Sequence, residues 1–158
     1  EVIGFDSNLG SAYAKATLGA GSELPIKGNI FISVNESDKM ETIPIARDFQ
    51  EFGFDIFATT GTAKVLKENG VKTKDIYKVG EGRPNVVDAI KNNEIQLVIN
   101  TPLGKQSRYD EYEIGRAAIK YKVTAITTIQ GAQAAVRAVR NIKFGKLNYQ
   151  SLQDIFNN

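Results

Sequence analysis

The chain has 158 residues, 42% of them hydrophobic and 24% charged, which is the composition of an ordinary globular domain with a core of its own. Its net charge of +2 comes from 20 basic and 18 acidic residues that are interspersed, and this balance argues against a nucleic-acid partner. The chain has neither Cys nor His, which excludes disulfides, thiolate nucleophiles, imidazole bases and Ser-His-Asp triads.

No apolar run approaches the roughly 20 residues of a membrane-spanning helix, and no signal peptide is visible in the sequence. We therefore expect a cytoplasmic protein with no membrane partner. Because the first residue is Glu1 rather than Met, we also expect a fragment or a processed product.

The first 28 residues differ in pattern from the rest. Ser7 can begin a short helix that Gly19 and Pro25 end. One short helix cannot bury its own apolar face. We therefore interpret residues 1–28 as the tail of a preceding domain with a linker, and residues 29–158 as the domain itself. An N-terminal arm packed on this domain is an equally good physical interpretation.

From Gly28 onward, apolar runs typical of buried strands alternate with helical spacing. Strands are predicted at residues 29–34, 55–59, 76–79, 96–101 and 123–129. Helical segments follow each strand, and a last short helix is predicted at residues 149–156. Five strands alternating with helices imply right-handed crossovers. They predict an α/β fold, a doubly wound, Rossmann-like five-stranded parallel sheet flanked by helices.

Three helix starts carry specific predictions. The helix after the second strand is expected from Ala63, beyond a Thr-Thr-Gly-Thr turn. The helix of residues 85–91 is expected to use Pro84 at its allowed starting position. Asp110 is expected to cap the next helix, with Glu113 three residues on, close to a capping box.

The turn after the second strand has the features of an anion site. Gly61 lets the backbone approach a ligand closely, and free N–H groups of a helical first turn point toward it. The hydroxyls of Thr59, Thr60 and Thr62 add donors. Plain turn chemistry is the alternative interpretation of such small residues.

Other polar loops are expected at the same edge, because every strand of a parallel sheet meets its helix there. Their cations are Lys39, Lys78 with Arg83, and Lys105. With Asn100 and Thr101, they predict a cup that holds a phosphate-bearing small molecule.

Each of these side chains also has an ordinary structural interpretation. The lysines can be solvated, and Asn100 can simply cap a strand end. Arg83 can brace its loop to Glu81 or Asp88. The joint placement at one edge is therefore more informative than any single residue.

Catalysis is not expected in this chain. Asp38, Glu81 and Asp88 are candidate acids or bases near the edge, but none has a second titratable group at a telling spacing. No metal-binding cluster of a recognised spacing is present in the sequence.

Several motifs resemble the methylglyoxal-synthase-like domain family. They are Gly28-Asn-Ile-Phe-Ile-Ser-Val-Asn-Glu-Ser-Asp-Lys39, Phe57-Ala-Thr-Thr-Gly-Thr-Ala63, Tyr77-Lys-Val-Gly-Glu-Gly-Arg-Pro84 and Leu97-Val-Ile-Asn-Thr-Pro102. The segment from Phe5 to Gly21, leading to Leu24-Pro25, resembles the end of the second ATP-using half of the carbamoyl-phosphate synthase large chain. The resemblance covers residues 1 to about 140.

The resemblance implies a regulatory domain that does none of the chemistry and needs no cofactor. ATP and Mg or Mn belong to the catalytic halves upstream, which make carbamoyl phosphate for pyrimidine and arginine biosynthesis. The implied partners are a nucleotide effector (UMP as inhibitor, IMP as activator in some members), the rest of the large chain, the small glutamine-amidotransferase chain, and other large chains in an oligomer.

Carried over by position, the resemblance implies an effector site. Its phosphate contacts would be Lys39, Thr59, Gly61 and Thr62, while Lys78, Asn100 and Thr101 would hold the remainder. Thr60, Arg83, Lys105 and Thr127 complete the candidate set.

The chain departs from the family at this site. Where some members have Thr-Thr-Ser-Gly-Arg-Arg, it has Thr101-Pro-Leu-Gly-Lys-Gln106, so one Thr contact and two arginines are replaced. Ala125 stands where ornithine-responsive members have Tyr, which argues against ornithine activation although Thr127 remains. The chain has no Trp, unlike the acetylglutamate-binding animal type.

Three rival interpretations remain. A true methylglyoxal synthase would need histidines, and the chain has none. The inosinate-cyclising domain of purine synthesis shares some motifs but lacks the N-terminal tail. An assembly module that binds no ligand is the third.

Overall fold

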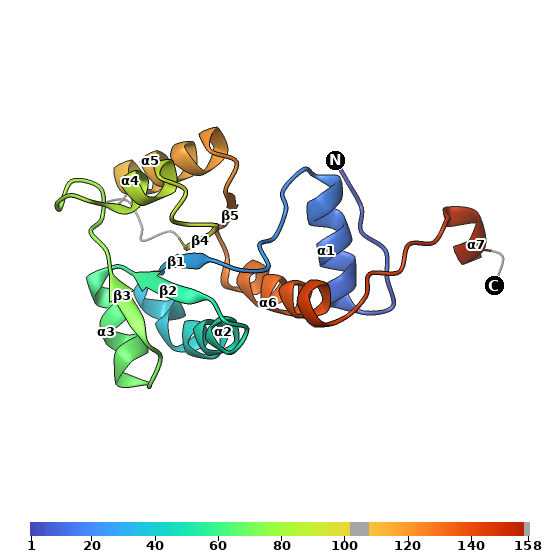
Figure 1. The fold of residues 1–158 in the computed structure, drawn as a ribbon, viewed down its shortest axis with the longest axis horizontal. Coiled ribbons are helices and arrows are strands. Elements are labelled where there is room, and N and C mark those ends of the chain that lie inside the picture. The colour runs from blue at the N-terminus through green and yellow to red at the C-terminus, as the bar shows by residue number, and fades with distance from the viewer. Residues whose placement is uncertain (102–107, 157–158) are drawn as a thin grey trace.

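The computed structural model describes residues 1–101 and 108–156, which form a parallel sheet between two layers of helices (Figure 1). The strands are β1 (Asn29–Ser33), β2 (Asp55–Ala58), β3 (Thr73–Asp75), β4 (Leu97–Asn100) and β5 (Thr124–Ile126). They pair in the order β3-β2-β1-β4-β5, and every pair is parallel. The predicted doubly wound α/β fold is therefore confirmed.

The helices cover both faces of the sheet. They are α1 (Leu9–Gly19), α2 (Lys39–Glu51), α3 (Thr60–Glu68), α4 (Val86–Lys91), α5 (Arg108–Lys120), α6 (Ile129–Phe144) and α7 (Leu152–Phe156), with a 3₁₀ turn at Glu36–Asp38 before α2. Figure 1 shows α4 and α5 above the sheet and α2 and α3 below it. The short helix α7 lies far from the sheet (Figure 1).

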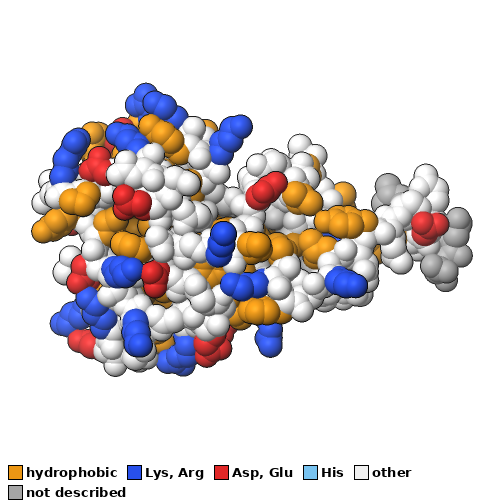
Figure 2. All heavy atoms as spheres, in the orientation of Figure 1, with side chains coloured by type: hydrophobic (Ala, Val, Ile, Leu, Met, Phe, Trp, Pro, Cys, Tyr) orange, Lys and Arg blue, Asp and Glu red, His pale blue; other side chains and the backbone are white. Residues whose placement is uncertain are grey.

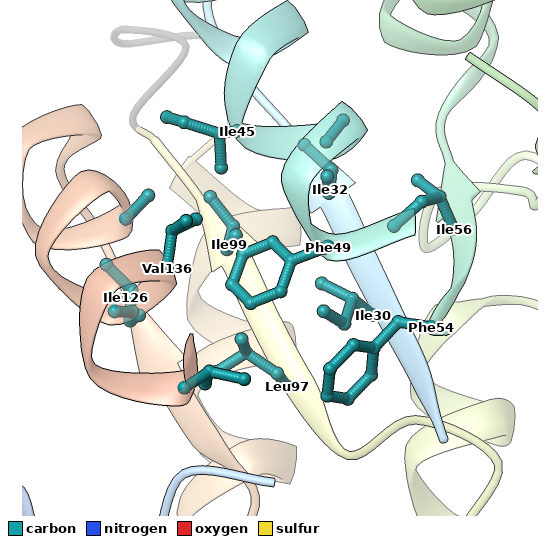
Figure 3. Close-up of a cluster of buried hydrophobic side chains, with 14 of the residues drawn as sticks. Ile30, Ile32, Ile45, Phe49, Phe54, Ile56, Leu97, Ile99, Ile126 and Val136 are labelled. Atoms are coloured by element: carbon teal, nitrogen blue, oxygen red, sulfur yellow. The ribbon is translucent and has the colours of Figure 1, made fainter. Parts of the chain in front are cut away.

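The central strand β1 shows why the sheet needs both layers. Successive side chains of a strand point to opposite faces. Ile30 and Ile32 accordingly join the larger core with α2 and α6, where Phe49 lies over the sheet (Figure 3). Phe31 points the other way, into a second core with Val86 and other residues of α4 and α5. A continuous apolar run is thus buried on both faces.

The third strand was predicted at residues 76–79, and that prediction is wrong. The strand is β3, in which Thr73 pairs with Ile56 of β2. It lies at the edge of the sheet, so polar side chains such as Lys74 can face solvent. Ile76 and Val79 are apolar because they pack against the second core from a loop, not because they belong to the sheet.

The three predicted helix starts also shift. Helix α3 begins at Thr60, so the Thr-Gly-Thr residues form its first turn. Asn85 is the N-cap of α4, in a capping box with Asp88, and Pro84 precedes the cap. Helix α5 begins at Arg108, so Asp110 lies in its first turn and not at its cap.

The predicted fifth strand, residues 123–129, is longer than β5. The chain leaves the sheet after Ile126 because Thr128 is the N-cap of α6. Its hydroxyl accepts a hydrogen bond from the backbone N–H of Gly131 at 3.1 Å.

The N-terminal segment packs on α6. Asn141 donates hydrogen bonds to Asn8 Oδ1 at 2.7 Å and to Ser11 Oγ at 3.1 Å. A Cβ on Gly10 would lie 2.7 Å from the carbonyl oxygen of Arg137, so only glycine fits at this approach. These contacts are those of an N-terminal arm packed on the domain. The division of the chain into two units at residue 28 stays a prediction.

The capping box of α4 gives a stability prediction. Asn85 is buried, and its side chain accepts hydrogen bonds from the N–H groups of Val87 and Asp88. Asn85→Ala should lower the free energy of unfolding by about 1–2 kcal/mol in urea titrations. As a control, Asn92→Ala at the exposed C-cap should change it by less than about 0.5 kcal/mol. Equal effects of the two substitutions would contradict the cap.

Candidate functional site

The strand order places a topological switch point between β1 and β4, where ligands bind in open α/β sheets. Ser33 and Asn100 end these strands and pair with each other. Beyond them, the N–H of Thr101 donates to the Ser33 carbonyl oxygen, and the N–H of Asn35 donates to Thr101 Oγ1, both at 3.0 Å. The two strand ends are thereby held together.

Buried hydroxyls attach the start of α3 to the end of β1. Ser33 Oγ lies 3.1 Å from Thr59 Oγ1, and the N–H of Val34 donates to Thr62 Oγ1 at 3.3 Å. Ser33, Thr59 and Thr62 are each only 3% exposed. Because Thr59 and Thr62 are engaged in this way, their backbone N–H groups are better placed than their hydroxyls to meet a ligand.

The amino end of α3 is open toward Lys39. Thr59 is the N-cap but makes no side-chain capping bond, and Thr60 and Gly61 are exposed. Lys39 Nζ lies 3.5 Å from the position that a Cβ on Gly61 would occupy. An ammonium group therefore lies at the positive end of the α3 dipole, where an anion would be stabilised by both.

A carboxylate partly balances this ammonium. Glu36 contacts Lys39 Nζ at 2.5 Å, but the Glu36 side chain is 88% exposed whereas that of Lys39 is 16% exposed. A glutamate so accessible to solvent is readily displaced, since exposed ion pairs contribute little free energy. The position held by Glu36 thus suits the exchange of one anion for another.

Lys78 lies beside α5, within the loop between β3 and α4. Its N–H donates to the Glu81 carboxylate at 3.2 Å. Burial raises the pKa of Asp110, and the positive charge of Lys78 lowers it in part. The carboxylates of Glu81 and Glu111 raise it less strongly. The loop therefore brings a cation and a carboxylate to the first turn of α5.

Arg83 lies near Asp88, as expected if it braces its own loop. Its side chain is 82% exposed, and Nε lies 3.9 Å from a carboxylate oxygen of Asp88. A contact of this length and exposure braces the loop only weakly.

Asn100 and Thr127 line one small cavity at the ends of β4 and β5. Its volume is about 90 Å³, and Glu111, Gly115 and Ala125 also line it. Asn100 is buried, whereas Thr127 is exposed. The cavity is large enough for a few waters or a small polar group of a ligand. Lys105, together with Pro102 and Gln106, lies outside the described residues.

The carboxylates considered as catalysts have structural partners. Asp38 accepts from the Asn35 amide at 2.7 Å, Glu81 accepts from the N–H of Lys78, and Asp88 closes the α4 capping box. Within residues 1–101 and 108–156, no three His, Cys, Asp or Glu side chains gather as metal ligands. No helix in that part of the chain is long and apolar enough to cross a membrane.

Sequence reasoning missed Ser33, Asn35 and Glu36 as individual contributors. A signal for Glu36 was available, because residues three apart on a helical turn can pair, and Glu36 precedes Lys39 by that spacing. Ser33 and Asn35 had no local signal, since their partners Thr59 and Thr101 are distant in the sequence.

Comparison with known proteins gives matches at the level of the family and the fold. Residues 41–127 match the family model described as MGS-like domain. The "Carbamoyl phosphate synthase large chain, C-terminal section" of Aquifex aeolicus is 49% identical over 99% of this chain and 30% of its own length. The corresponding protein of Methanopyrus kandleri is 50% identical over 98% of this chain and 29% of its own length.

The match to longer relatives extends over a smaller share of their length. The "Carbamoyl phosphate synthase large chain" of a Nostoc species is 46% identical over 98% of this chain and 14% of its own length. The chain thus spans less than a third of these three relatives. Among solved structures, "Crystal structure of ForH" covers 74% of this chain and 82% of its own, with a TM-score of 0.51 and 14% identity, and so supports the fold alone.

Proposed function

Because the chain belongs to the MGS-like domain family and is a homologue of the C-terminal section of carbamoyl phosphate synthase large chains, we propose that it is the effector-binding domain of such an enzyme. It binds a nucleotide monophosphate, UMP as inhibitor or IMP as activator, and so regulates carbamoyl phosphate synthesis for pyrimidine and arginine biosynthesis in the cytoplasm. The chemistry, with its ATP and metal, takes place in the rest of the large chain, supplied with ammonia by a small glutamine-amidotransferase chain.

The observation that carries the proposal is the position of the Lys39 ammonium at the uncapped amino end of α3. A phosphate bound there accepts hydrogen bonds from the ammonium and from first-turn N–H groups, and it displaces the exposed Glu36 carboxylate. The nucleoside then extends along the carboxyl edge of the sheet toward Asn100 and Thr127.

Calorimetry with UMP, IMP and inorganic phosphate tests the proposal. Saturable binding of a nucleotide monophosphate, with weaker competition by phosphate, is the expected result. Titration of the whole enzyme with the same nucleotides should then change its rate of carbamoyl phosphate synthesis. Absence of binding by either nucleotide would favour an assembly module, in which Glu36 rather than a ligand neutralises Lys39.

The substitution Gly61→Ala tests whether a ligand approaches the amino end of α3, and it should do so without destabilising the chain. The new methyl group would lie 3.5 Å from Lys39 Nζ, an ordinary contact, and Gly61 has no positive φ. The variant should therefore fold, with a free energy of unfolding unchanged or raised by up to about 1 kcal/mol. Nucleotide affinity should fall about tenfold because the methyl group occupies the space of a phosphate oxygen.

The matched control for this variant is Gly70→Ala. Gly70 follows the other end of α3 with a φ of 80°, so alanine there should destabilise the chain without changing nucleotide affinity. If Gly61→Ala binds nucleotide as the parent chain does, the anion does not bind at this helix terminus.

A further inference from the structure

The ammonium group of Lys143, in the last turn of α6, connects two distant parts of the chain. Lys143 Nζ donates hydrogen bonds to the carbonyl oxygen of Ile26 at 2.9 Å and to that of Phe52 at 2.5 Å. It also lies over the rings of Phe54 and Phe144, 5.4 and 5.8 Å from their centroids. Ile26 lies between α1 and β1, and Phe52 is the C-cap of α2. We call this contact the linker clamp.

Dipoles and aromatic rings, rather than a carboxylate, stabilise the charge in the linker clamp. Lys143 forms none of the ion pairs found within residues 1–101 and 108–156. The Phe52 carbonyl belongs to the carboxyl end of α2, where the helix dipole favours a cation, and the faces of aromatic rings attract one. Loss of the ammonium therefore leaves no carboxylate without its partner, and a variant that lacks it should fold.

Helix α2 joins the linker clamp to the proposed nucleotide site. Its first residue is Lys39, whose ammonium lies 3.5 Å from the Cβ position of Gly61 at the amino end of α3. Its 13 residues span about 20 Å. Pro44 lies within the helix, but the buried Ile43 and Ile45 on either side of it hold the helix against the core. One helix thus has the proposed ligand contact at its amino end and the linker clamp at its carboxyl end.

The other side of the linker clamp leads to the N-terminal arm. Helix α6 packs against both α1 and α2, and Figure 1 shows it between them. Figure 2 shows basic and hydrophobic side chains interspersed over this part of the surface. Two residues after Ile26, the segment enters the sheet, where the N–H of Asp55 donates to the Gly28 carbonyl oxygen at 3.2 Å. The clamp therefore holds the arm at the point where it meets the domain.

We propose that the linker clamp couples nucleotide binding to the N-terminal arm, and so transmits the effect of the ligand toward the rest of the large chain. The inference rests on the proposed function, since it requires a nucleotide phosphate at Lys39. A helix that is fixed at one end loses less conformational freedom when its other end is fixed. Phosphate at the amino end of α2 and Lys143 at its carboxyl end therefore strengthen each other, and by linkage the clamp must also raise nucleotide affinity.

Hydrogen exchange, spin labelling and calorimetry on the 158-residue chain test this coupling with Lys143→Met. Methionine keeps an unbranched apolar stem but has no donor. In the parent, saturating UMP or IMP should slow exchange of the Phe54 N–H, which closes α2 by donating to the Phe49 carbonyl oxygen, about fivefold. It should also restrict a nitroxide attached through Lys27→Cys, at an exposed position of the linker. In Lys143→Met both responses should be absent, and nucleotide affinity should be about fivefold weaker.

Two further variants separate the clamp from a general effect of charge. Lys146→Met removes an exposed lysine three residues further on and should behave as the parent does. Lys143→Arg keeps the charge and the donors and should retain both responses. Equal responses in Lys143→Met and the parent would overturn the proposal, as would an arginine variant that behaves like the methionine variant.

The same measurements distinguish this inference from the proposed function. A parent chain that binds neither nucleotide refutes both, whereas one that binds nucleotide without slowing exchange or restricting the label refutes the coupling alone. In the whole enzyme, Lys143→Met should leave the rate without nucleotide unchanged but reduce the change in rate that saturating nucleotide causes. An undiminished change in rate would show that the effect of the ligand does not pass through the linker clamp.

Discussion

Lys39→Ala should reduce the affinity for a nucleotide monophosphate by about 10- to 100-fold. The ammonium lies 3.5 Å from the Cβ position of Gly61, so its loss removes the charged donor at the amino end of α3. A hydrogen bond to a charged group contributes about 1.5–3 kcal/mol, which corresponds to the stated loss. Calorimetry measures the affinity, and urea titration should show a free energy of unfolding within about 1 kcal/mol of the parent, because the Glu36 partner is exposed.

The control for this experiment is Lys64→Ala. Lys64 is an exposed lysine on the same helix, so its loss changes the net charge equally without removing a donor at the helix terminus. Its effect on affinity should stay below about threefold, since an exposed charge acts through screened, longer-range attraction. If both variants bind nucleotide equally weakly, the field of the whole chain rather than a site attracts the anion, and the proposed phosphate contact is wrong.

Phe49→Ala should cause the largest loss of stability, about 3–5 kcal/mol. Phe49 is 0% exposed and lies over the central strands (Figure 3). Its ring meets Phe52 and Phe54 edge to face, with centroids 6.4 and 5.6 Å apart. Alanine leaves a cavity in the core that the sheet cannot close. Since whole domains are stable by about 5–15 kcal/mol, urea unfolding should shift to much lower concentration.

Phe144→Ala is the matched control for the core. Phe144 also packs edge to face, with its centroid 5.6 Å from that of Phe52, but it is 63% exposed. The same chemical change should therefore cost less than about 1.5 kcal/mol, because most of this ring already contacts water. Similar losses from the two substitutions would mean that Phe49 is not the centre of the core.

The class of fold could be predicted because a strand that is buried on both faces needs a continuous apolar run, which is visible in the sequence. A strand covered on both faces must be apolar at successive positions, as residues 30–32 and 97–99 are, and these residues lie in β1 and β4 at the centre of the sheet. Edge strands need no such apolar run. β3 contains Thr73, Lys74 and Asp75, so its sequence does not distinguish it from a loop, and the more apolar residues 76–79 were chosen instead.

The sequence by itself determined the class of sheet, four of its five strands and the polar loops that follow them, because the apolar spacing of a strand or a helix is set by neighbouring residues. Only the tertiary structure decided what those polar groups contact. It engaged Thr59 and Thr62 with β1, directed Arg83 toward Asp88, and brought Lys39 to the amino end of α3. These partners belong to different elements, and a contact between them exists only after the chain has packed.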